Sequence, residues 1–137
     1  MTYRSKQTNY HNGRNYAEDG IQKLIVGWLR YNGYLFTSIP AGLFVSAKQQ
    51  MLATKLGYTA GAPDLIVWIP GGTLSIECKR PEKRVLNMKT GNMVIEQAAG
   101  RQSAEQKAFQ ERVTSTPGHY YLVAKDLQDV IRFFEYV

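Results

Sequence analysis

Residues 64–79 read DLIVWIPGGTLSIECK, and this stretch decides the fold. Leu65–Ile69 is an unbroken run of apolar, β-favouring residues, so we expect a central strand that is covered on both faces. Pro70-Gly71-Gly72 is typical of a turn, and the residues from Thr73 to Arg80 alternate between apolar and polar. The stretch therefore predicts two strands of a sheet, joined by a tight turn.

The second of these strands carries charged side chains on one face. Side chains alternate along a strand, so Glu77 and Lys79 share a face while Cys78 points into the core as a buried, inert thiol. If Gly71-Gly72 forms a two-residue turn, Asp64 comes to lie opposite Lys79 on that same face. The pairing then predicts that an aspartate, a glutamate and a lysine converge from adjacent strands.

Such a cluster has a chemical interpretation. Two neighbouring carboxylates raise each other's pKa unless a cation lies between them. Mg²⁺ prefers oxygen ligands and keeps several waters, and we expect Mn²⁺ to substitute for it. A lysine beside the ion can polarise a bound water or stabilise charge developing on a phosphate. The simpler alternative is a surface pair of Glu77 and Lys79, with Asp64 serving only the loop.

The rest of the chain predicts a sheet with helices on both sides. Apolar residues recur at helical spacing after Glu18, and Asn32-Gly33 ends that helix. The further predicted elements are a strand over Tyr34–Ile39, a helix over about 47–56 capped by Ser46, a hairpin around Thr90-Gly91-Asn92, a helix over about 103–115, a strand over Tyr120–Ala124 and a helix after Asp126. This order indicates an α/β fold with a mixed β-sheet.

Length and composition limit the class of protein. The 137 residues suit a single domain over 17–137, preceded by a mobile basic arm over 1–16. A net charge of +6 favours a polyanionic partner, nucleic acid first. A single cysteine excludes a disulfide framework and fits a reducing cytoplasm, and no apolar run is long enough for a membrane span. There is no phosphate-binding Gly-Lys-Ser/Thr loop, so we expect no nucleotide cofactor.

The segment Gly61-Ala62-Pro63-Asp64, followed after twelve residues by Glu77-Cys78-Lys79, resembles the core motif of the PD-(D/E)xK nucleases. Ser103 and Gln106 open a later helix, and with the leading helix they make the chain similar to the VRR-NUC (virus-type replication-repair nuclease) branch, in its stand-alone phage form. The resemblance runs from about Glu18 to the C-terminus. It implies a restriction-endonuclease-like mixed sheet flanked by helices.

The resemblance also implies roles for matching residues. Asp64 and Glu77 would bind the metal through their carboxylates, and the backbone carbonyl of Cys78 would add a ligand. Lys79 would position the attacking water.

Two further residues have simpler alternatives. Gln106 would orient Lys79 or the substrate phosphate, yet its distance from Ser103 also suits the return arm of a capping box. Glu18 would reach the metal directly or through water. An acidic residue in the first turn of a helix is, however, also ordinary compensation of the helix dipole.

The basic residues around this segment predict the path of a DNA backbone, with strongly salt-dependent binding. They are Arg80, Lys83, Arg84, Lys89, Arg101 and Lys107. The alternative is a charged loop that is simply solvated.

The resemblance as a whole implies a Mg²⁺-dependent DNA endonuclease. Its substrate would be branched DNA, such as four-way junctions or flaps, met in replication, repair or recombination. We expect a homodimer, located in the bacterial host's cytoplasm if the chain is phage-encoded. One rival is a non-catalytic nucleic-acid-binding module on the same fold. Another is a nuclease with an RNA or sequence-specific target.

Overall fold

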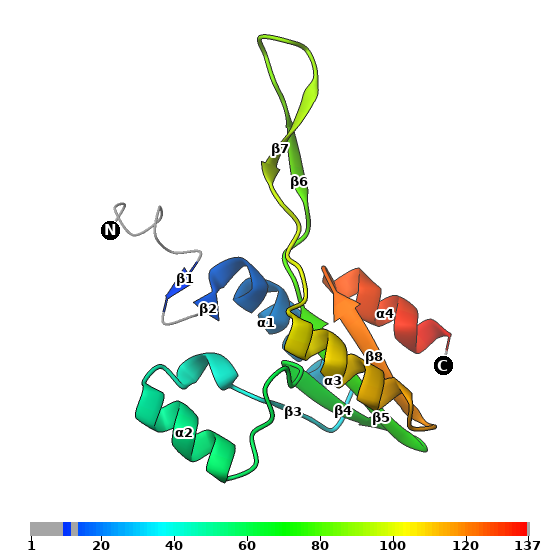
Figure 1. Cartoon of the computed structure of the whole chain (residues 1–137). Coiled ribbons are helices and arrows are strands. Elements are labelled where there is room, and N and C mark those ends of the chain that lie inside the picture. The colour runs from blue at the N-terminus through cyan, green and yellow to red at the C-terminus, as the bar shows by residue number, and fades with distance from the viewer. Residues whose placement is uncertain (1–9, 12–13, 137) are drawn as a thin grey trace.

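The computed structural model describes residues 10–11 and 14–136, and a mixed β-sheet is its central feature (Figure 1). In chain order the elements are β1 (Tyr10–His11), β2 (Arg14–Asn15), α1 (Tyr16–Tyr31), β3 (Phe36–Ser38), the 3-10 helix η2 (Ala41–Leu43), α2 (Ala47–Lys55), β4 (Leu65–Ile69), β5 (Gly72–Cys78), β6 (Lys83–Leu86), β7 (Met93–Gln97), α3 (Ala104–Thr114), β8 (His119–Ala124) and α4 (Leu127–Glu135). The predicted α/β class is confirmed. None of the described helices is long and apolar enough to cross a membrane.

The sheet has the strand order β3-β4-β5-β8. Its first three strands are antiparallel neighbours, and β5 and β8 run parallel. The parallel pair needs a long crossover, which the β6–β7 hairpin and α3 provide. The mixed sheet predicted from the sequence is therefore present, and its parallel pair places β8 beside the strand that carries Glu77.

The turn between β4 and β5 differs from the prediction. Ile69 pairs with Gly72, so the turn residues are Pro70 and Gly71, and Gly71 has φ 80°. Gly72 therefore lies in strand β5 and not in the turn. Glycine is needed at this position, because a Cβ there would lie 1.6 Å from the carbonyl oxygen of Gly118.

In the observed register, the residue opposite Asp64 on β5 differs from the predicted one, but Asp64 remains on the predicted face of the sheet. Leu65 pairs with Ile76, and continuing that register sets Asp64 opposite Glu77, where Lys79 was predicted. Because the difference is two residues, the side chain of Asp64 stays on the predicted face.

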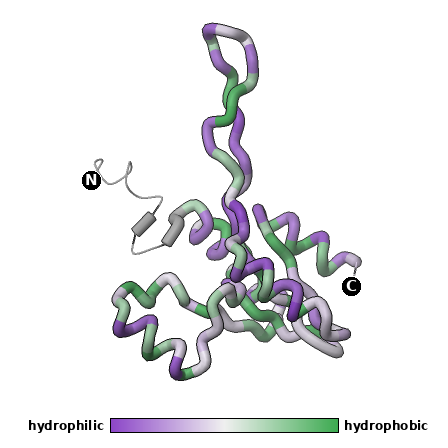
Figure 2. Tube along the Cα trace, in the orientation of Figure 1, coloured by the Kyte–Doolittle hydropathy of each residue, from purple (hydrophilic) through white to green (hydrophobic). Residues whose placement is uncertain are grey.

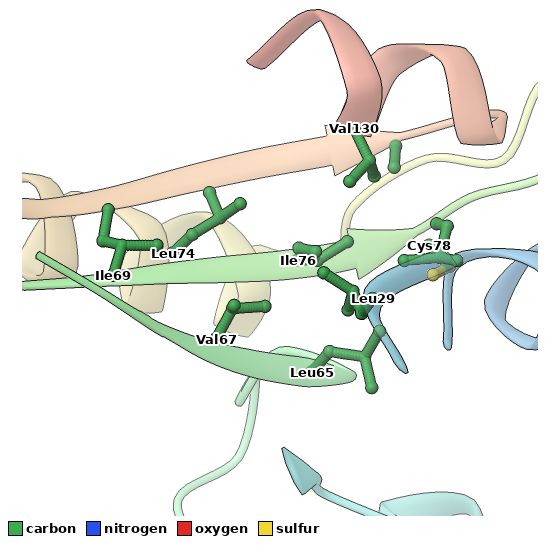
Figure 3. Packing of buried hydrophobic residues seen from close by; sticks show 10 residues of the cluster. Leu29, Leu65, Val67, Ile69, Leu74, Ile76, Cys78 and Val130 are labelled. Carbon is green, nitrogen blue, oxygen red and sulfur yellow. The ribbon is translucent and has the colours of Figure 1, made fainter. Parts of the chain in front are cut away.

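The hydrophobic core lies between the sheet and the helices α1 and α4 (Figure 3). Its buried members are Ile25, Leu29, Leu65, Val67, Ile69, Leu74, Ile76, Cys78, Ala124 and Val130. Burial of Cys78 raises the pKa of its thiol, in keeping with the inert thiol predicted.

The prediction that β4 is covered on both faces is wrong. Trp68, on the face opposite the core, is 47% exposed, and Ile66 is only half-buried. The described helix on that face, α3, packs against β8 and does not extend over the β3–β4 half of the sheet. A run of apolar, β-favouring residues indicates a strand, but it does not show whether helices cover both faces of that strand. The packing of the helices decides this.

Two segments extend from the sheet and its helices. The predicted hairpin is present as β6 and β7, which pair with each other and project away from the rest of the chain (Figure 1). Hydrophobic and hydrophilic segments alternate along it (Figure 2). The predicted helix α2 is also present, and Ser46 caps it in a reciprocal capping box with Gln49.

The N-terminal arm is only partly described. β1 and β2, which pair antiparallel, form a short ladder in a region where no regular structure was expected. Residues 1–9 and 12–13 lie outside the described part, so the mobility of the arm stays a prediction.

Candidate functional site

A cavity of about 810 Å³ opens where β5 ends, and the five residues expected to carry the chemistry all line it. They come from four separate parts of the chain, since Glu77 and Lys79 lie two residues apart. The five are Glu18 of α1, Asp64 before β4, Glu77 of β5, Lys79 after it and Gln106 of α3. The structure therefore brings together the predicted catalytic set.

Asp64, which is half-buried, and Glu77, which is buried, form an acidic pair. The backbone N–H of Cys78 donates to Oδ2 of Asp64 at 2.7 Å, which fixes that carboxylate against the neighbouring strand. Glu77 is 2% exposed, and its Oε1 is buried without a hydrogen-bond partner among the described residues. A buried carboxylate oxygen without a donor is costly, so the site favours a ligand that supplies positive charge or a proton.

Lys79 lies against the same pair. Its Nζ is 3.7 Å from Oε2 of Glu77, and the residue is 8% exposed. Lysine is seldom buried to this degree unless it is paired. One ammonium group therefore faces Glu77 and, more weakly, Asp64 and Glu18.

The electrostatics of the site disfavour three ionised carboxylates. Burial, followed by the charge of Asp64, raises the pKa of Glu77 to about 8. Burial also raises the pKa of Asp64, against the opposing effect of the Cys78 N–H, and that of Glu18, against the opposing charge of Lys79. The surroundings of Glu77 therefore favour its protonated form, because desolvation penalises the charged form.

Gln106 forms the capping box that the sequence suggested, and its amide also contacts Glu77, where a contact with Lys79 or the substrate phosphate was predicted. Its Oε1 accepts from the backbone N–H of Ser103 at 2.8 Å, and Ser103 Oγ accepts from the Gln106 N–H at 3.1 Å, which completes a capping box. The other end of the same amide, Nε2, donates to Oε2 of Glu77 at 2.9 Å. The helix cap thus aims an amide donor at the acidic pair.

A glycine lets this helix approach the site. Gly61 has φ 87°, and a Cβ there would lie 2.2 Å from the carbonyl oxygen of Glu105. The loop that delivers Asp64 therefore lies directly against the first turn of α3.

Glu18 faces the site from the first turn of α1. Its Oε2 lies 3.4 Å from the backbone N–H of Arg80, and a Cβ on Gly100 would come within 3.0 Å of the same oxygen. Compensation of the helix dipole does not require this placement, since a solvent-facing side chain would serve equally well.

The residues present fit a divalent cation. Carboxylate oxygens from opposite strands meet, one of them has no donor within the described chain, and hard cations such as Mg²⁺ prefer such ligands. In the described part of the chain, no group of three or more His, Cys, Asp or Glu side chains is arranged to hold a metal by itself. A bound Mg²⁺ would accordingly keep several waters, which is its usual behaviour.

The predicted DNA-binding residues are divided between the cavity and its surroundings. Arg80 and Arg101 line the cavity. Lys83 lies on the projecting hairpin, where it pairs with Glu96. Arg84, on the same strand, pairs with Glu82; Lys89 lies in the turn of the hairpin, and Lys107 is exposed on α3.

Sequence reasoning missed three residues near the site. Tyr121 of β8 pairs with Ser75, so it shares the face of Glu77, and its buried hydroxyl has no hydrogen-bond partner among the described residues. Burial and the charge of Glu77 raise the pKa of this phenol. Lys23 and Arg30 line the cavity from α1. Their seven-residue spacing was a usable signal, because it sets both on one side of a helix.

No protein-family model and no curated protein matches the chain by sequence. Among solved structures, the chain is similar to one described as "VRR_NUC domain protein", with 22% sequence identity and a TM-score of 0.60. The similarity covers 88% of this chain and 86% of the other. This similarity shows the general class of the fold, which is a restriction-endonuclease-like nuclease fold built on a mixed sheet flanked by helices. Within that class the chain has the VRR-NUC fold, as the resemblance in the sequence implied.

Proposed function

We propose that the protein is a metal-dependent endonuclease that hydrolyses phosphodiester bonds of DNA, with Mg²⁺ as its cofactor and Mn²⁺ able to replace it. One observation supports this above the others. The buried Oε1 of Glu77, which has no donor among the described residues, belongs to an acidic pair that has a lysine 3.7 Å away. A structural salt bridge would require neither the second carboxylate nor an oxygen left without a partner.

Each residue then has a defined task. Asp64, Glu77 and the backbone carbonyl of Cys78 would hold the cation, which supplies charge to lower the pKa of water and to neutralise the phosphate. Lys79 orients the attacking water and stabilises charge that develops on the phosphate. Gln106 holds Glu77 in place through its Nε2 donor.

Two further elements support the site. Glu18 completes its acidic rim and would reach the metal directly or through water. The six predicted basic residues would bind the DNA backbone, and two of them, Arg80 and Arg101, line the cavity that contains the acidic pair. Branched DNA and a homodimeric state, implied by the resemblance, remain parts of the proposal.

Cleavage of a labelled panel tests the proposal. The panel comprises duplex, single strand, 5′ flap, 3′ flap and four-way junction, each incubated with Mg²⁺, with Mn²⁺ and with EDTA. We expect wild type to cut at least one substrate with either metal and none in EDTA. Asp64→Asn, which removes a ligand charge at nearly constant shape, should be inactive and controls for contaminating nuclease. Cutting by the variant, or cutting in EDTA, would contradict the proposal.

A thermal shift measurement separates metal binding from cleavage. A ligand that binds only the folded state raises the Tm as its concentration increases. Mg²⁺, Mn²⁺ and non-catalytic Ca²⁺ should therefore stabilise wild type, and Asp64→Asn should lose the shift. Equal shifts in both proteins would place the cation elsewhere and favour a binding module without catalysis.

A further inference from the structure

The cavity continues beyond the acidic pair as a groove along α1. One side of this helix, presented by Asp19, Lys23, Gly27 and Arg30, forms one wall. These residues recur every three or four positions, as one face of a helix does. Residues 38–43, including η2, form the opposite wall.

Charge changes sign along this groove. Glu18 and Asp19 lie at the end next to the acidic pair, whereas Lys23 and Arg30 lie further along. Arg30 follows Glu18 by twelve residues, which at 1.5 Å per residue is about 18 Å along the helix axis. Lys23 forms no ion pair with any described residue, and the guanidinium of Arg30 lies 5.8 Å from the ring centroid of Phe36. The cationic end is therefore available to a polyanion.

Gly27 leaves the middle of this wall open. A glycine inside a helix costs about 1 kcal/mol relative to alanine. Packing does not require it here, because a Cβ at Gly27 would meet no described atom within 4 Å. The missing side chain exposes helix backbone to the groove, which allows a ligand to approach closely. Gly20 of the same helix has the same free space but does not line the groove.

We propose that this groove binds a single, unpaired nucleic-acid strand that continues from the scissile phosphate toward Arg30. The proposal rests on the proposed function of the acidic pair at its end. The volume of about 810 Å³ is that of an ordinary ligand pocket and suits a short stretch of one strand. With stacked nucleotides at roughly 3.4 Å each, a path of about 18 Å holds about five.

The charged and the apolar residues that line the groove fit the two parts of a strand. Lys23 and Arg30 contact phosphates, and apolar side chains of Val26, Ile39 and Leu43 face the bases without reading their sequence.

The length of a single-stranded tail is the direct test. The affinity of wild type in EDTA, where no cleavage occurs, is measured by fluorescence anisotropy on labelled hairpin duplexes. These carry oligo-dT tails of increasing length on either the 5′ or the 3′ end, or no tail. Affinity should rise with tail length up to about five nucleotides and then level off, for one tail polarity more than the other. A tail that adds nothing, or a gain that grows steadily well beyond that length, would overturn the proposal.

Substitutions then locate the tail. Lys23→Ala and Arg30→Ala should each reduce the gain from the tail and flatten its salt dependence, by about 0.7 in the slope of log K against log salt for each phosphate that is no longer neutralised. Gly27→Phe should abolish the gain by filling the groove, whereas Gly20→Phe, an equal change on the same helix, should retain it. A Tm for every variant identifies loss of folding. A full gain in Gly27→Phe and in the protein with both Lys23→Ala and Arg30→Ala would refute the groove.

The two proposals can fail separately. Metal-dependent cleavage without any effect of a tail would leave the nuclease intact and remove the groove. Tail-dependent binding that Gly27→Phe abolishes, in a protein that cuts nothing, would retain the groove and remove the nuclease.

Discussion

Glu77 is a buried carboxyl whose ionised form is disfavoured by its surroundings. It lies almost fully buried between Asp64 and Lys79, and one of its oxygens receives no hydrogen bond from the described part of the chain. The residue therefore carries an unfavourable charge at high pH, and a bound cation would relieve it.

Stability should depend on pH through this carboxyl. Burial raises the folded-state pKa of Glu77 from 4.5 to about 8, so the protonated form stabilises the fold at low pH. That contribution is complete below the unfolded pKa and is lost as pH rises toward 8, on the order of a few kcal/mol. In EDTA, the Tm of wild type should fall between about pH 5 and pH 8 relative to that of Glu77→Gln. A difference in Tm that does not change with pH would show that Glu77 ionises normally.

The two roles of Gln106 can be separated by mutation. Ser103→Ala removes only the cap and should cost about 1 kcal/mol of stability, with most cleavage retained. Gln106→Ala removes its half of the cap and also the donor to Glu77, and should lower the metal-dependent cleavage rate or metal affinity by about 10- to 100-fold. The comparison requires cleavage rates and unfolding curves for both variants. Equal activity in the two would mean that the hydrogen bond to Glu77 does not matter.

At the scale of elements, the loop before β4 sets the position of α3. Gly61→Ala combines a positive φ with a Cβ 2.2 Å from the carbonyl oxygen of Glu105, so it should destabilise the fold by more than about 1 kcal/mol and displace Gln106 from Glu77. Gly57→Ala is the matched control, since its φ is 107° but a Cβ there meets no described atom within 4 Å. Chemical denaturation and cleavage assays of both variants check this. Equal losses of stability and activity would attribute the effect to backbone strain alone.

The projecting hairpin should contribute to binding and not to stability. Its strands pair with each other, and an isolated two-stranded hairpin is marginal by itself. Replacing residues 84–95 by a short glycine-containing turn should leave the Tm nearly unchanged. It removes Arg84 and Lys89, so the salt slope of duplex binding should fall by up to about 0.9 for each phosphate that these side chains neutralise. Arg84→Ala with Lys89→Ala in the full chain is the control for charge alone. A large fall in Tm would show that the hairpin packs on the rest of the chain.

Local patterns predicted the elements well and their long-range relations less well. The caps at Ser46 and Ser103 and the alternation that buries Cys78 are read from neighbouring residues, and they were confirmed. The turn between β4 and β5 was displaced, because Gly72 is required in the strand by its approach to Gly118, a residue far away in the chain. No local pattern carries that information.

At the scale of the whole molecule, local patterns likewise predicted only the part of the site that lies on neighbouring strands. Asp64 and Glu77 could be placed together because one tight turn joins their strands. Gln106 and Glu18 were suggested only by resemblance, since helices of unknown packing carry them. The groove along α1 was missed, because its second wall comes from residues 38–43 and only the folded chain brings the two walls together.

The facing positions of Asp64 and Glu77 also bear on how the chain folds. A hairpin closed by Pro70 and Gly71 brings its strands together early, whereas the parallel pair of β5 and β8 must wait for a long loop to close. The carboxylates of Asp64 and Glu77 would then come together before α3 and α1 pack beside them. If this hairpin belongs to the folding nucleus, Mg²⁺ accelerates refolding as well as slowing unfolding, and stopped-flow refolding with and without the ion shows the difference. The cation would in that case assist the assembly of the sheet before it takes part in any reaction.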